Sequence, residues 1–310
     1  MLQSQEEEFI RITLQLARAK ATCQRAIILS GSASYPSTWC PAIGVDQLPA
    51  NRTTSGTYDQ VALAYEERIV PFYKDIAKAL VSLAHIRKGA RILDVGAGTG
   101  IVARVAEPSL RPNGMVVLLD KAAPMLAVAR DRMPRMAGAA AWVCLVEESE
   151  SMSLDSDQFD SVLGQFSYVE ESPRAMQEVF RVLGPGGELA LAVWGPDRIH
   201  DEYHLLAAAR RLIGAPPVPP HPSTATVLSR LRAAGFVAAR VRQRFFPGVY
   251  PDMETYLAYR DAFPWRTRLH RSFWRRYLPA VRSAAESYKD RRGRVNIRRS
   301  VNFITARCPR

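Results

Sequence analysis

The middle of the chain alternates between two patterns of apolar and polar positions. Short apolar runs, typical of buried strands, cover residues 91–95, 115–119, 141–146, 160–166 and 188–194. Apolar positions at helical spacing lie between these runs and predict helices over residues 101–107, 123–133 and 173–183. Strands that alternate with helices through short connections imply right-handed crossovers. The pattern therefore predicts an α/β fold with a doubly wound, parallel sheet.

The segments before this core follow other patterns. Residues 2–29 have the apolar spacing of one amphipathic helix, and residues 30–57 have the Ser, Gly, Pro, Asn and Thr content of a linker. Helical turns follow from Tyr58 to Ala84, with a break expected near Pro71. These patterns predict an N-terminal extension and linker over residues 1–55.

The rhythm changes after Pro196. Helices are predicted over residues 204–213 and 226–234, and two more strands over 237–246 and 301–307, with a basic helical insert between those strands. We therefore expect a core over residues 56–200, followed over residues 201–310 by helices and by the last strands of the sheet. The insert at residues 249–298 and the helix near His204 are candidates for a lid over a substrate site.

Composition and charge narrow the class of protein. Apolar residues make up 47% of the 310 residues, which is enough for a core, and no apolar run reaches the roughly 18 residues that would span a bilayer. The four cysteines, Cys23, Cys40, Cys144 and Cys308, lie far apart and form no metal-binding pattern. No metal is expected, and a reducing cytoplasm is the predicted location.

The positive charge is concentrated in the last third of the chain. Residues 201–310 hold 22 Lys or Arg against seven Asp or Glu, so they carry +15 while the whole chain carries +12. Such asymmetry indicates either an anionic partner, including nucleic acid, or an arginine-rich solvated surface. We favour the surface, because arginines interleaved with aromatics at helical spacing are typical of a packed amphipathic helix.

A glycine-rich loop follows the first strand of the core. It reads Gly96-Ala97-Gly98-Thr99-Gly100 and comes directly after Asp94-Val95. Dinucleotide folds use a different spacing, G-x-G-x-x-G, and an acid two residues before the first glycine would repel a pyrophosphate. The loop therefore favours a nucleoside ligand that carries a cationic amino group.

Acids also follow the next two strands. Asp120 ends the second strand, where a carboxylate can accept hydrogen bonds from both hydroxyls of a ribose. Glu147-Glu148-Ser149-Glu150 follows the third strand, where an acid can accept from an adenine amine. Because the carboxyl ends of parallel strands meet at one edge of the sheet, these acids and the loop predict one nucleoside site.

Several motifs in order resemble the class I S-adenosylmethionine-dependent methyltransferases, particularly the ubiquinone/menaquinone-biosynthesis type (methyltransferase type 11). The similarity spans residues 58–195, and the segments that carry it are Tyr58-Asp59 through Ala64-Tyr65, Ile92 to Gly100, Asp120 with Pro124-Met125-Leu126, Phe159 to Val162, and Arg181 to Gly187. The resemblance implies a Rossmann-like, mostly parallel seven-stranded sheet with an antiparallel last strand and a helical C-terminal insert. It also implies S-adenosyl-L-methionine as the cofactor.

The resemblance assigns roles to particular positions. Gly96, Ala97 and Gly98 would line the methionine portion of the cofactor, with Asp94 orienting it, and Asp120 would bind the ribose. Met125 would pack on the adenine, and Glu148, where Asp is commoner, would read the adenine edge with the Ser149 backbone. Gln165 would lie near the sulfonium and Tyr65 would close the pocket. Gly100 and Lys121 complete the predicted cofactor-binding set.

The reaction that this resemblance implies is direct transfer of a methyl group, which needs alignment in a water-poor site and no nucleophilic side chain. No catalytic residue is assigned. A general base, if the acceptor needs one, has five candidates: Tyr168, Glu170, Glu171, His200 and His204. Gly164-Gln165-Phe166-Ser167-Tyr168 lacks the Pro-Pro-aromatic turn of nucleic-acid amino-methylating enzymes, so a small organic acceptor, methylated on oxygen or carbon, is favoured. The alternatives are a nucleic-acid-binding protein or RNA methyltransferase that uses the basic third, and a cofactor-binding protein without activity.

Overall fold

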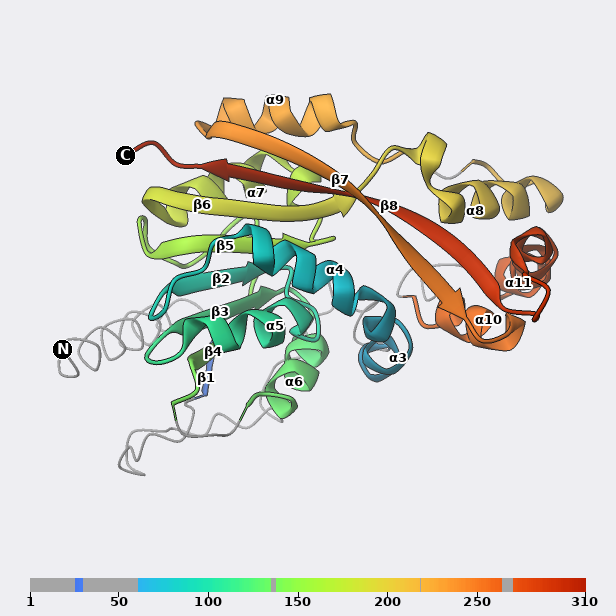
Figure 1. Cartoon of the computed structure of the whole chain (residues 1–310), viewed down its shortest axis with the longest axis horizontal. Coiled ribbons are helices and arrows are strands. Elements are labelled where there is room, and N and C mark those ends of the chain that lie inside the picture. Colours follow the sequence, from blue (N-terminus) through green and yellow to red (C-terminus); the bar gives the residue numbers. More distant parts are fainter. Residues whose placement is uncertain (1–25, 30–60, 135–137, 218, 264–269) are drawn as a thin grey trace.

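A single mixed sheet organises the molecule (Figure 1). The computed structural model describes residues 26–29, 61–134, 138–217, 219–263 and 270–310. The strands lie in the order β1-β4-β3-β2-β5-β6-β8-β7. Their bounds are β1 (Ala26–Leu29), β2 (Arg91–Val95), β3 (Met115–Asp120), β4 (Ala141–Val146), β5 (Phe159–Gln165), β6 (Leu183–Trp194), β7 (Val237–Tyr250) and β8 (Val295–Arg307).

Strand directions confirm the predicted fold class. The five strands β4, β3, β2, β5 and β6 pair in parallel, and β8 runs antiparallel to both of its neighbours, β6 and β7. The chain order of the strands reverses between β2 and β5. The carboxyl ends of these two strands therefore flank a topological switch point, which is where open α/β sheets bind their ligands.

Helices cover both faces of the sheet because successive strand side chains point to opposite faces and form two separate apolar cores. Ile92 belongs to the core beneath α4 and α5, whereas Leu93 belongs to the core beneath α7 and α9. The helices of the first face are α3 (Ala62–Arg68), α4 (Val70–Leu83), α5 (Ile101–Leu110) and α6 (Ala123–Asp131). Those of the second face are α7 (Pro173–Val182) and α9 (Thr224–Ala234).

The last strands continue beyond the sheet and carry the C-terminal helices. Trp194, the final residue of β6, pairs with Val301 of β8, so residues 295–300 of β8 extend past the carboxyl edge of β6 and continue their pairing with β7. Figure 1 shows this β7–β8 ribbon reaching towards α10 and α11. The helices here are α8 (Asp201–Leu212), α10 (Met253–Asp261) and α11 (Arg271–Ala285), and short 3₁₀ turns lie at Val169–Glu171, Asp197–Ile199 and Glu286–Tyr288. No helix within the described residues is long and apolar enough to cross a membrane.

Three local predictions were wrong. The helix expected over residues 2–29 gives way at Ala26–Leu29 to β1, an eighth strand antiparallel to β4, and the rest of that prediction lies outside the described residues. The helical break falls at Ile69, and Pro71 lies in the first turn of α4, where its missing N–H costs nothing. The strand expected over residues 188–194 begins earlier, at Leu183, and its irregular start pairs with β5 through a register shift.

Candidate active site

The glycine-rich loop joins β2 to α5 at the switch point. Gly96, Gly98 and Gly100 have φ angles of +65°, +54° and +79°, in the left-handed region that favours glycine. A Cβ on Gly96 would lie 2.7 Å from the Cβ of Ser167, whereas a Cβ on Gly98 would meet nothing within 4 Å. The loop therefore packs tightly at Gly96 and leaves open space beside Gly98, where a ligand can approach the backbone.

Asp94 lies at the end of β2, buried beneath this loop. Its side chain is 1% exposed, and its Oδ2 accepts a hydrogen bond of 3.1 Å from the backbone N–H of Ala103 in α5. Burial raises the pKa of this carboxyl to about 7; the Ala103 hydrogen bond opposes the shift and the charge of Asp120 adds to it. A cationic group brought near Asp94 would favour the ionised form.

Asp120 ties the end of β3 to the glycine-rich loop. Its Oδ2 accepts from the N–H of Gly98 at 2.8 Å, and its Oδ1 accepts from the N–H of Ala122 at 2.9 Å. Burial raises the pKa of this carboxyl too, against those two hydrogen bonds. Since a carboxylate oxygen has a second lone pair, both oxygens retain capacity for ligand hydroxyls.

Lys121 and Glu148 lie at the rim of the site. The Lys121 Nζ is 3.8 Å from the Glu148 Oε2, and the two side chains are 39% and 50% exposed. Glu148 and the half-buried Ser149 belong to the loop that follows β4. An exposed ion pair thus links the residue after β3 with the loop after β4 at this edge of the sheet.

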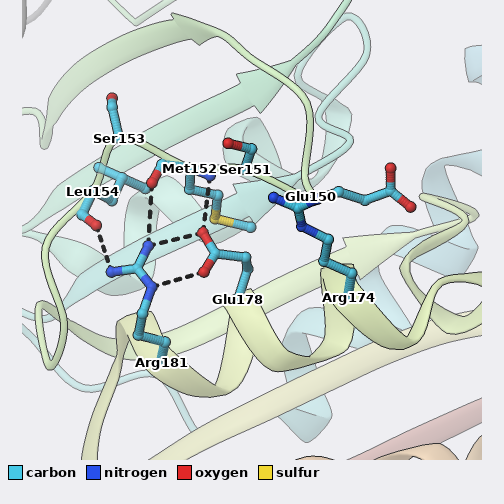
Figure 2. Close-up of a pocket in the computed structure, with 8 residues that line it drawn as sticks. All are labelled: Glu150, Ser151, Met152, Ser153, Leu154, Arg174, Glu178 and Arg181. Atoms are coloured by element: carbon cyan, nitrogen blue, oxygen red, sulfur yellow. Dashed lines mark hydrogen bonds and ion pairs between the residues drawn. The ribbon is translucent and has the colours of Figure 1, made fainter.

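The α7 helix anchors the loop that carries Glu148 (Figure 2). Arg181 donates to the carbonyls of Met152 at 3.1 Å and Leu154 at 2.7 Å, and it pairs with Glu178. Glu178 in turn accepts from the N–H of Met152 at 2.9 Å. The depression drawn in Figure 2 is lined by these anchoring groups, which bind one another, so we assign it to the scaffold of the loop.

Tyr65 and Met125 pack together between α3 and α6. Met125 is 1% exposed and lies in a small apolar cluster with Val61 and Ala62, against which Tyr65 packs. Burial raises the pKa of the Tyr65 hydroxyl, and the nearby groups that add to the shift include Tyr168, Tyr259 and Asp120. The α3 helix therefore covers Met125, the residue that the resemblance predicts to pack on the adenine.

Gln165 ends β5 on the other side of the switch point. Its Nε2 donates a long hydrogen bond of 3.5 Å to the carbonyl of Tyr73. Its Oε1, the Thr99 Oγ1 and the Ser167 Oγ are buried without a hydrogen-bond partner among the described residues. Buried polar atoms are nearly always paired in folded proteins. These three oxygens lie on the loop that follows β2 and at the end of β5, which are the two segments that meet at the switch point. They fit a site for a polar ligand such as S-adenosylmethionine.

An aromatic group lies next to Gln165. Phe166 stacks on Trp194 with ring centroids 3.8 Å apart, and Tyr73 contacts both rings. Phe166 and Tyr168 have φ angles of +53° and +62°, which non-glycine residues rarely adopt. Such strain persists only where surrounding packing fixes it, and it is common at ligand sites.

The five candidate bases have different surroundings. Tyr168, Glu171 and His204 are exposed, and burial raises the pKa of Glu170 to about 7. His200 is 5% exposed, it contacts Trp194 edge-on, and its Nδ1 has no hydrogen-bond partner among the described residues. Burial lowers the pKa of His200 to about 4, so its imidazole is neutral at physiological pH. His200 is therefore neutral, but a pKa this low makes it a weak base, whereas the pKa of Glu170 lies near physiological pH.

Sequence reasoning did not single out several polar and aromatic groups at this edge. Thr99 and Ser167 lie inside or next to the predicted motif, so their proximity was a usable signal. Tyr73, Tyr259 and Arg299 come from α4, α10 and β8, and only the fold brings them together. Among the described residues, no group of three or more His, Cys, Asp or Glu side chains is placed to hold a metal ion.

Comparison with known proteins agrees with this geometry. A family profile described as a methyltransferase domain matches residues 92–187, which run from β2 into β6. The structure resembles the crystal structure of the YcgJ protein of Bacillus subtilis, with a TM-score of 0.54 and 18% identity over 76% of this chain and 99% of that one. Residues 92–187 thus match a methyltransferase domain, in agreement with the predicted class I S-adenosylmethionine-dependent methyltransferase fold and with S-adenosyl-L-methionine as the cofactor.

Within this class, two relatives in Methylococcus capsulatus illustrate the similarity. The malonyl-[acyl-carrier protein] O-methyltransferase is 28% identical over 209 residues, which cover 66% of this chain and 73% of the relative. The ubiquinone/menaquinone biosynthesis C-methyltransferase UbiE is 30% identical over 154 residues, which cover 48% and 59%. Three proteins of the latter name from Pseudomonas are matched over 43% of their length.

Neither of these relatives is named for a nucleic-acid substrate, so the comparison gives no support to the nucleic-acid alternative. Arg240, Arg242 and Arg244 are exposed on β7, at the edge of the sheet. Charged side chains on an edge strand are a common means of preventing strands of different molecules from pairing. The arrangement agrees with the surface interpretation of the charge.

Proposed function

We propose that this protein transfers the methyl group of S-adenosylmethionine to a small organic acceptor. The observation that carries the proposal is the edge between β2 and β5, where the open space at Gly98, the buried carboxyl of Asp94, the partly buried carboxyl of Asp120 and three unpaired buried oxygens occur together. Few other ligands combine an ammonium, a ribose and an adenine, which are the groups that these side chains suit.

The proposed cofactor-binding roles are those that the resemblance to the methyltransferases implies. Asp94 would attract the ammonium, Asp120 would accept from the ribose hydroxyls, and Gly96, Ala97, Gly98 and Gly100 would keep the backbone close to the ligand. Glu148 and Ser149 would read the adenine edge, with Lys121 holding Glu148 by the ion pair at the rim. Met125 and Tyr65 would contact the ring system, and Gln165 would face the reacting end.

The bound cofactor supplies a methyl group that is already activated by a positively charged sulfur. The chain itself must orient the acceptor and exclude water, which are the main contributions a protein makes to such a displacement. Phe166, Trp194 and Tyr73 provide an apolar wall beside Gln165 for the acceptor. His200 contacts Trp194 and would extend this wall, and no general base is assigned.

The names of the relatives support an oxygen or carbon atom as the methylated position, since one relative is an O-methyltransferase and the other a C-methyltransferase. We also propose a cytoplasmic location, which is supported by the two cysteines in the described residues: Cys144 and Cys308 are buried free thiols. Neither proposal depends on the other.

Ligand binding tests the cofactor assignment directly. S-adenosylmethionine and S-adenosylhomocysteine should bind in calorimetry and raise the melting temperature, because a ligand selective for the folded state stabilises it. NADH should do neither. Incubation with methyl-labelled cofactor and a panel of aromatic, polyketide and quinone-like acceptors then identifies the product. Absence of cofactor binding to the folded protein, or tighter binding of NADH, would contradict the proposal.

A further inference from the structure

A cavity lies between the end of α4 and the strands β7 and β8. Its volume is about 130 Å³, which is room for several water molecules and therefore for a phosphate or carboxylate group. Leu83 lines it from α4 and Phe303 lines it from β8. The charged side chains of its wall include three arginines, Arg240, Arg242 and Arg307, so the cavity is basic.

This cavity is remote from the cofactor-binding edge of the sheet. Glu188, which lines it, pairs with Arg307 of β8, and Trp194 ends β6 six residues later. Six residues of strand span about 20 Å. In Figure 1 this is the end of the sheet where β8 finishes, opposite to the arrowheads of the parallel strands. A ligand bound here would therefore occupy a second site.

Arg240 and Arg242 lie on the face of the sheet that α4 covers. They pair with Thr305 and Phe303 of β8, and directly opposed residues of an antiparallel ladder point to the same face. Phe303 belongs to the apolar core beneath α4, whereas both arginines are exposed. Two charged side chains therefore line a cavity that has an apolar base and that solvent can reach.

The charge of these two arginines is not neutralised by their surroundings. Neither guanidinium forms an ion pair or a side-chain hydrogen bond with the part of the chain that the structure describes. The acid in the described lining is Glu188, and its Oε2 lies 3.7 Å from the Nη2 of Arg307. Because Arg307 balances Glu188, Arg240 and Arg242 leave the cavity with two positive charges.

Two structural explanations for these arginines do not account for the cavity. The α4 helix ends at Leu83, and basic side chains often donate to the last carbonyls of a helix. Neither Arg240 nor Arg242 donates such a hydrogen bond to the described residues. Charge on an edge strand also prevents strands of different molecules from pairing, but Arg244 provides that charge without lining the cavity.

The backbone is strained at two positions that line this cavity. His85 has a φ of +44° and Ala238 a φ of +52°, in the left-handed region that favours glycine. Ala238 lies in a bulge, because the register of β7 against β8 shifts between Val237 and Arg240. Bulges and strained residues are common beside binding sites, where they direct side chains towards a ligand.

We propose that this cavity binds the phosphate group of a small phosphate ester. The two unpaired guanidinium groups match the charge of a phosphate dianion, and each can donate to two of its oxygens. A carboxylate would leave one of the two charges unmatched. The ligand is neither the cofactor, which carries no phosphate, nor a group placed at the methyl-transfer site, so this inference does not rest on the proposed function.

The experiment compares Arg242→Gln with Arg244→Gln in the full-length chain. Arg244 lies on the same face of β7 and is also exposed, so its replacement removes the same charge without changing the cavity wall. Calorimetry at about pH 8, where a phosphate ester is a dianion, measures binding of phenyl phosphate, of its monoanionic counterpart phenyl sulfate, and of inorganic phosphate. The melting temperature and the affinity for S-adenosylhomocysteine are measured for each protein.

The wild type and Arg244→Gln should bind phenyl phosphate more tightly than phenyl sulfate or inorganic phosphate. Arg242→Gln should bind phenyl phosphate about tenfold more weakly, and the Arg240→Gln, Arg242→Gln double variant more weakly still. Melting temperatures and S-adenosylhomocysteine affinities should not change, because the replaced side chains are exposed and lie far from the cofactor.

The inference is overturned if the wild type does not prefer phenyl phosphate, or if Arg242→Gln keeps the wild-type affinity. Equal losses in Arg242→Gln and Arg244→Gln would assign binding to diffuse surface charge, and displacement of phenyl phosphate by S-adenosylhomocysteine would assign it to the cofactor site. Failure of the wild type to bind S-adenosylhomocysteine would refute the proposed function alone, so the two failures are distinguishable.

Discussion

The buried carboxyl of Asp94 should make cofactor binding depend on pH. In the free protein, burial raises the pKa of Asp94 to about 7, far above the ordinary value of 3.8. If the ammonium of S-adenosylhomocysteine lies near this group, as proposed, its positive charge favours the ionised carboxylate and lowers the pKa in the complex. Binding then requires loss of a proton at any pH below about 7, so affinity should fall as pH falls.

The size of this effect follows from the fraction of Asp94 that is ionised. With a pKa of about 7, roughly one tenth of the carboxyl is ionised at about pH 6 and roughly three quarters at about pH 7.5. The affinity for S-adenosylhomocysteine should therefore be about eightfold lower at about pH 6, a difference of about 1.2 kcal/mol. Calorimetry at both pH values, in buffers with different ionisation enthalpies, measures the affinity and the proton release together.

Two controls isolate Asp94 from the other acids of the site. The compound 5′-methylthioadenosine has the adenine and ribose but lacks the ammonium, so its affinity should change much less over the same pH range. The Asp94→Asn variant keeps an oxygen that can accept from Ala103 but cannot titrate, and its affinity for S-adenosylhomocysteine should be flat. A flat profile in the wild type, or an unchanged slope in Asp94→Asn, would refute the role given to Asp94.

The other predictions concern the cofactor-binding residues Asp120 and Gly98, the buried His200, and Gly235, which ends helix α9. Asp120→Ala should weaken S-adenosylhomocysteine binding by about 1 to 3 kcal/mol, and Gly98→Val should be at least as harmful because its side chain enters the open space and its φ is +54°; unchanged calorimetric affinity in both folded variants would place the cofactor elsewhere. His200 has a folded-state pKa of about 4, below its ordinary value of 6.5. The stability that neutral His200 contributes is therefore complete above about pH 6.5 and is lost as pH falls towards about 4, by up to about 3 kcal/mol. Denaturant melts should show this loss of stability at acid pH in the wild type and not in His200→Phe. Gly235→Ala should cost about 1 to 3 kcal/mol, because φ is +105° and the new Cβ would lie 2.8 Å from the Phe180 ring; an unchanged urea midpoint would contradict the strain.

The cofactor half of the site was predictable because its determinants are local in sequence. Asp94, the glycine-rich loop and Asp120 each follow directly from a strand whose apolar run is visible, and the carboxyl ends of parallel strands meet without further information. The same logic fixed the bounds of β2, β3, β4 and β5 to within one residue, whereas β6, β7 and β8 each extend four to six residues beyond the predicted strand. The eighth strand was missed because Ala26–Leu29 is four residues long and lies inside a stretch with helical spacing.

The acceptor half was not predictable in the same way because it is assembled from distant segments. Tyr73 and Tyr259 lie 186 residues apart along the chain, yet their hydroxyls meet. No local pattern encodes such a pair, since each tyrosine reads as an ordinary apolar position of its own helix. Arg299 is a charged residue on the inward face of a strand that alternates apolar and polar positions. It can be recognised as unusual only after the inward face of that strand has been assigned.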